Sequence, residues 1–154
     1  MLVPAWYLPD TDWFAQLRDA PQPAGETRAV LDRLDHLLRD EPAFGPDQTV
    51  AATYVILLGV EHLGDAMAHA AGVHDLGDVV RLLCGLNLAV AHLTQTVQRI
   101  AGHADDRSIR GLDRASGGAL DAFADHLGAA GASGEILAGH LKEAHLLLRT
   151  FTTQ

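Results

Sequence analysis

Apolar residues recur every three or four positions along most of the chain, and no stretch shows the alternation expected of a strand. This period predicts helices over residues 11–19, 25–39, 47–71, 76–101 and 107–130, and from residue 133 onward. Long helices joined by short connections are typical of antiparallel bundles. The sequence therefore predicts an all-α fold: an antiparallel bundle of four long helices plus one or two short N-terminal helices.

Glycine marks two places in the last third of the chain. Ser116, Gly117 and Gly118 lie within the predicted helix 107–130, where each glycine costs roughly 1 kcal/mol of helix stability relative to alanine. The stretch GAAGASG, residues 128–134, has the composition of a flexible turn. We expect this turn to separate the last two long helices.

The helices predicted over 47–71 and 76–101 are apolar on more than one face. Besides their inward stripes, they carry outer apolar positions at Ala51, Val55, Leu58, Val80, Cys84 and Leu88. A helix that is apolar all round is normally buried. Either the remaining helices wrap these two completely, or the surplus faces meet a second subunit in a two-fold homodimer.

Aromatic residues gather near the N-terminus, at Trp6, Tyr7, Trp13 and Phe14. Two interpretations stay open for this segment, residues 1–23: it packs across the bundle, or it extends from it. In the second case Trp6, Tyr7 and Trp13 would anchor a protein partner, since Trp and Tyr are favoured at interfaces. A length of 154 residues fits one domain over 1–154.

Composition restricts the partners. A net charge of −9 with eleven basic residues argues against binding to nucleic acid, whose phosphates require many cations. The longest apolar run, Ala51 to Val60, is followed by Glu61, and a membrane span needs about 20 apolar residues. The first basic residue is Arg18, unlike a secretory signal, so we expect a cytoplasmic location without membrane contact.

His74 and Asp75 are the first candidate for chemistry. The run Ala-Ala-Gly-Val-His-Asp-Leu-Gly, residues 70–77, resembles the central motif of the HD phosphohydrolases. That resemblance implies a metal-dependent hydrolase in which this pair ligates a divalent ion, together with an earlier histidine and a later aspartate. The same letters also describe a helix start: Gly72 ends one helix, Asp75 caps the next, and Asp78 faces the positive end of its dipole.

A second constellation lies in the helix predicted over 47–71. His62, Asp65 and His69 fall on one helical stripe, opposite the expected core stripe of Ile56, Val60, Leu63 and Met67. Three such side chains could hold zinc if another helix supplied a fourth ligand. The alternative is a solvated helix face.

These observations favour a non-catalytic helical bundle that acts through protein–protein contact, as a homodimeric accessory or regulatory protein without a cofactor. Val55, Leu58, Val80, Cys84 and Leu88 are the candidate interface residues, with Trp6, Tyr7 and Trp13. Two alternatives remain: a small phosphohydrolase using His74 and Asp75, and a bundle that binds a small apolar ligand between its helices.

Overall fold

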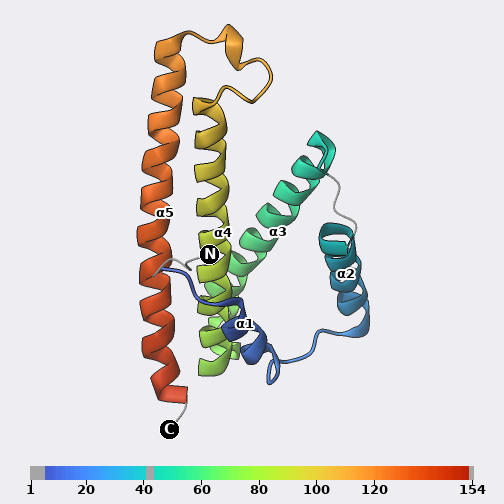
Figure 1. Ribbon diagram of the computed structural model, residues 1–154. Coiled ribbons are helices and arrows are strands. Elements are labelled where there is room, and N and C mark those ends of the chain that lie inside the picture. The colour runs from blue at the N-terminus through green and yellow to red at the C-terminus, as the bar shows by residue number, and fades with distance from the viewer. Residues whose placement is uncertain (1–5, 41–43, 153–154) are drawn as a thin grey trace. The chain divides into compact units, whose positions relative to one another are not determined.

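Every regular element is a helix in the residues described by the computed structural model, which are 6–40 and 44–152 (Figure 1). The all-α prediction is therefore confirmed. The chain divides into two compact units. One contains the described residues up to Asp19 and from Leu76 onward, and the other runs from Ala20 to Asp75. A single domain over 1–154 stays a prediction.

The first unit is built on two long helices. They are α4, Leu76–Asp105, and α5, Gly117–Thr152, and they run side by side along most of their length (Figure 1). The short helix η3, Leu112–Arg114, lies in their connection, where Arg107 and Gly111 have positive φ angles of 52° and 93°. We call α4 and α5 together the hairpin.

The hairpin is held by a seam with the spacing of a coiled coil. Five of the buried positions on α4 alternate at intervals of four and three, and three of those on α5 recur every seven residues. They are Val80, Cys84, Asn87, Ala91 and Thr94 on α4, and Gly131, Ala138 and His145 on α5. Most of these side chains are small, which lets the two backbones approach closely.

Helix α5 corrects the predicted turn at residues 128–134. The structure has one continuous helix there, and the predicted count of four long helices is not confirmed. The glycines serve packing instead: a Cβ on Gly131 would lie 3.0 Å from Gln98 Cγ, and one on Gly134 would collide with Thr94 Oγ1. Glycine at these positions lets α4 approach α5 closely. The packing gained along the seam offsets the poor helix propensity of glycine.

The described part of the aromatic segment packs on this hairpin. Residues Trp6–Leu17, which we call the N-terminal segment, comprise an extended stretch and the helix α1, Asp10–Leu17. Leu8 is almost fully buried and forms a cluster with Cys84 and Leu88 of α4, and Tyr7 and Trp13 pack against it. Of the two open interpretations, the described residues adopt packing within the chain.

The second unit contains the helices α2, Gly25–Asp35, and α3, Pro46–Ala70. The π-helix η1, His36–Asp40, continues α2, and the 3₁₀ helix η2, Ala71–Val73, continues α3. None of the residues of this unit whose burial is described is buried. The structure therefore differs from the sequence expectation that Ile56, Val60 and Leu63 form a core stripe, because all three are exposed.

Candidate functional site

The His74–Asp75 pair lies at the end of the second unit. His74 is half-buried, and its Nδ1 donates a hydrogen bond to the carbonyl oxygen of Ala70 at 2.9 Å. This contact orients the ring and leaves Nε2 as the nitrogen not bonded to Ala70. The contact is local, one helical turn back along the chain, and it contributes no further metal-ligating group.

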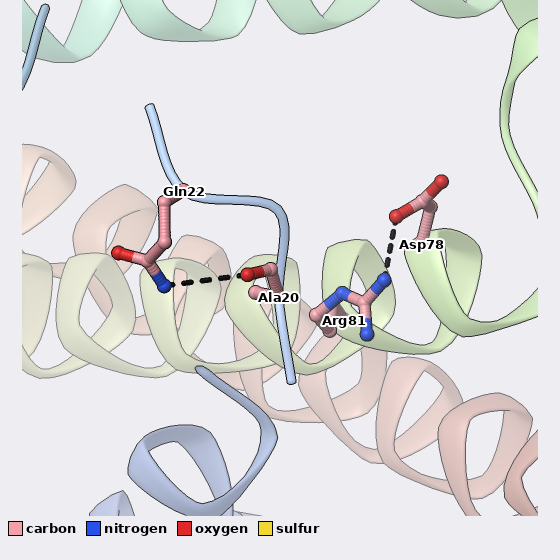
Figure 2. Close-up of polar contacts among 4 residues, drawn as sticks. All are labelled: Ala20, Gln22, Asp78 and Arg81. Carbon is pink, nitrogen blue, oxygen red and sulfur yellow. Dashed lines mark hydrogen bonds and ion pairs between the residues drawn. The ribbon is translucent and has the colours of Figure 1, made fainter. Parts of the chain in front are cut away.

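Asp78, the acidic residue in the first turn of α4, is paired with a cation. Its Oδ1 lies 2.6 Å from a guanidinium nitrogen of Arg81, three residues on, and the pair is partly shielded from solvent (Figure 2). Figure 2 also draws Gln22, whose Nε2 donates to the carbonyl oxygen of Ala20 at 3.3 Å. Asp78 thus has a structural role at the helix start.

The stripe of His62, Asp65 and His69 lies on α3, and all three residues are exposed. Within residues 6–40 and 44–152, no three side chains of His, Cys, Asp or Glu gather closely enough to hold a metal ion. Neither the pair at 74–75 nor this stripe is completed by ligands from elsewhere in the described chain. Chemistry at either place stays a prediction without geometric support.

Three predicted interface residues of α4 lie in the protein's own core. Val80, Cys84 and Leu88 are all buried, and Cys84 and Leu88 form a cluster with Leu8 of the N-terminal segment, so in this conformation the three residues offer no surface to a second copy. This corrects the sequence expectation for these positions. The physical reason is that Leu8, Tyr7 and Trp13 cover the surplus apolar face within the chain.

Asn87 is the polar centre of this core, and the sequence analysis missed it. The residue is 0% exposed. Its Oδ1 accepts from the backbone N–H of Leu8 at 3.1 Å, and its Nδ2 donates to the carbonyl oxygens of Trp6 at 3.1 Å and Ala138 at 2.7 Å. One side chain thereby joins the N-terminal segment, α4 and α5. The sequence feature that could have identified Asn87 is that it is a single polar residue between apolar residues of a predicted helix.

Two histidines bind side chains of the N-terminal segment. His145 is 0% exposed; its Nδ1 donates to the carbonyl oxygen of Val80 at 3.0 Å, and its Nε2 lies 3.4 Å from Nε2 of Gln16. Tyr7 Oη lies 3.2 Å from His92 Nε2, with the two rings edge to face. These contacts hold the segment on both helices of the hairpin.

The environment of Cys84 is apolar. Burial raises the pKa of its thiol and the Asp12 carboxylate adds to the rise, while a hydrogen bond from Gln16 and the charge of Arg149 act in the opposite direction. A buried thiol held in its neutral form is a small hydrophobic group and a poor nucleophile. Cys84 is therefore a packing residue in this conformation.

Helix α3 carries many exposed large apolar side chains. Ile56, Val60 and Leu63 are 44%, 57% and 37% exposed, and with the half-buried Met67 they form one stripe, which we call the α3 stripe. On other faces of the helix, Val55 and Leu58 are exposed as well. The sequence predicted both as interface contacts, and that assignment stays a prediction; neither residue belongs to the α3 stripe.

A groove runs between α2 and α3 inside the second unit. It has a volume of about 420 Å³ and is open to solvent, and its apolar lining comes from leucines of α2 and Val55 of α3. Its rim is charged, with Asp35 and Arg39 forming an ion pair at 2.7 Å. Because the groove is shallow and open, it extends the apolar surface of α3 and does not enclose a ligand.

Two stretches, Pro46–Val73 and Leu76–Asp105, are long and apolar enough to cross a membrane by length and composition. Helix α4 shares its apolar residues with the core described above. The α3 stretch carries Glu61 near its middle, where a charge in a bilayer costs roughly 2.5–3.5 kcal/mol or more.

Comparison of the chain with models of protein families, with curated proteins and with solved structures finds no match.

Proposed function

We propose that the protein acts through protein–protein contact as a homodimer in which the second unit, residues 20–75, packs against its counterpart. One observation carries the proposal: none of the residues with described burial in this unit is buried, although its two helices are rich in large apolar side chains. Helices of this kind gain their stability from packing an apolar face. Left in water, such a surface would promote aggregation.

The α3 stripe identifies the contact. Thr49, Thr53, Ile56, Val60, Leu63, Met67 and Ala70 alternate at intervals of four and three, the spacing with which helices of equal pitch pack together. A second α3 offers the same length and spacing, so a two-fold axis makes each contact occur twice. Fully burying one large apolar side chain contributes roughly 1.5–3 kcal/mol, and several on each copy are available.

The charges of α3 are compatible with this arrangement. Glu61 and Asp65 lie about 130° and 170° around the helix from the centre of the stripe, taking 100° per residue. Packing stripe against stripe therefore leaves the carboxylates in water. The opposite face, which carries Leu58, becomes polar from Glu61 onward and offers a shorter apolar contact.

Light scattering on two matched variants tests the proposal. We expect the protein at micromolar concentration to have twice the chain mass, Val60→Glu to give folded monomers, and Leu58→Glu to stay dimeric. If Leu58→Glu dissociates the dimer and Val60→Glu does not, the assigned face is wrong. A monomeric wild-type protein contradicts the dimer. In that case flotation with lipid vesicles tests whether α3 inserts into a membrane instead.

A further inference from the structure

We propose that the N-terminal segment, Trp6–Leu17, is a latch that opens from the hairpin as a unit while α4 and α5 stay folded. Opening uncovers Cys84 and Leu88, the two α4 residues that form a cluster with Leu8. This inference concerns the first unit alone and does not depend on the dimer formed through α3. It assigns a conformational role to the segment beyond completing the core.

The apolar contacts of the segment centre on one side chain, beside the polar contacts with Asn87, His92 and His145 described above. Leu8 is its one almost fully buried side chain among those described, and Trp6, Tyr7 and Trp13 are half-buried. Helix α1 has eight residues and no side-chain hydrogen bond at its N-cap, Pro9, and Phe14 on it is exposed. A short helix of this kind has little stability of its own away from its docking surface.

One of these contacts is incomplete. Gln16 Oε1 is buried and accepts no hydrogen bond from the described part of the chain, while its Nε2 lies near Asp12 O and His145 Nε2 at 3.3 and 3.4 Å. A buried acceptor without a donor weakens the docked state relative to a state in which water reaches it. The free energy difference between closed and open forms is reduced accordingly.

The hairpin keeps much of its own seam without the segment. Ala91, Thr94 and Gly131 are buried along its length, and Gln98 Nε2 donates to Glu135 Oε1 at 2.6 Å. Residues 18–24, which follow α1, contain two prolines and form no helix, so no helix continues from the segment on that side. Such an arrangement allows local opening at a lower free energy than global unfolding.

Cys84 provides the readout, since it is the chain's single cysteine, is 0% exposed and packs beneath Leu8. The full chain is treated with excess aromatic disulfide reagent at increasing urea, and helix content is followed by circular dichroism in parallel. We expect labelling at low urea to be much faster than global unfolding and nearly independent of urea, because opening exposes little surface. The rate should not depend on protein concentration.

Two variants sharpen the test. Leu8→Ala should raise the labelling rate at least tenfold without an equal change in the rate of global unfolding, while Ile136→Ala, on an exposed part of α5, should leave it unchanged. The proposal is overturned if labelling follows global unfolding from zero urea upward. If Leu8→Ala does not fold, the urea dependence of the wild-type protein decides alone.

Discussion

Asn87 Nδ2 lies 2.7 Å from the carbonyl oxygen of Ala138 and joins α4 to α5 at the point where the N-terminal segment crosses the hairpin. The same side chain satisfies the backbone of Trp6 and Leu8. A buried amide that serves three backbone groups on two other elements fixes their register as well as their proximity. The core of the first unit is thus organised around one polar residue.

Replacing Asn87 should be among the costliest changes in the chain. Asn87→Ala leaves one backbone N–H and two carbonyl oxygens without their partner, and we expect a loss of about 2–4 kcal/mol in the free energy of unfolding. Urea denaturation measures it. Gln22→Ala, at an exposed position, serves as the control and should change stability by less than about 0.5 kcal/mol. Equal, small effects of both changes would contradict the role of Asn87.

Two glycines of α5 should respond in opposite directions to alanine. At Gly128 a Cβ meets nothing within 4 Å, so Gly128→Ala should stabilise the helix by about 0.5–1 kcal/mol. At Gly134 the Cβ would collide with Thr94 Oγ1, so Gly134→Ala should destabilise the protein despite the better propensity. Thermal unfolding compares the two. Stabilisation by both would show that the seam does not pass Gly134.

Stability should fall at alkaline pH through Cys84. Because folding raises the pKa of this thiol, the native state still holds the proton where the unfolded chain has lost it. At a pH well below the ordinary thiol pKa of 9.0, Cys84 has no effect on the free energy of unfolding. Above that pH, its raised pKa destabilises the protein increasingly. Cys84→Ala should remove this part of the decline. Identical pH dependence of unfolding in both proteins between about pH 8 and 10.5 would contradict the assignment.

Salt should strengthen the proposed dimer. Each chain has a net charge of −9, so two copies repel each other, and the repulsion between exposed charges is screened over about 10 Å at 0.1 M salt. We expect the dissociation constant from sedimentation to decrease between about 50 and 500 mM salt. A contact made by pairing opposite charges would respond in the reverse direction.

The periodicity of apolar residues predicted α3 and α4 closely, but it also predicted a helix from residue 107, where the structure has turns and the short helix η3 before α5 begins at Gly117. The predicted ranges 47–71 and 76–101 lie close to α3 and α4. The turn predicted at residues 128–134 is absent because glycine has two roles that a sequence does not distinguish. It can allow a turn, or it can let a neighbouring helix approach closely. Only the position of Thr94 across the seam separates the two cases.

Surplus apolar residues on two helices were visible in the sequence, but their distribution between the chain's own core and open surface was not. Leu8, 79 positions before Asn87, decides that the α4 residues are covered. Contacts over such separations have no local signature in the sequence. The contacts of Asn87 are not indicated by any local pattern, because the groups that it binds at residues 6, 8 and 138 are distant in sequence.

The mass of the protein in solution tests the central claim most directly. Sedimentation equilibrium of the wild-type chain at micromolar concentration should give twice the chain mass of 16.4 kDa, falling toward 16.4 kDa on dilution. A mass of 16.4 kDa throughout that range, with intact helix content, would contradict the homodimer.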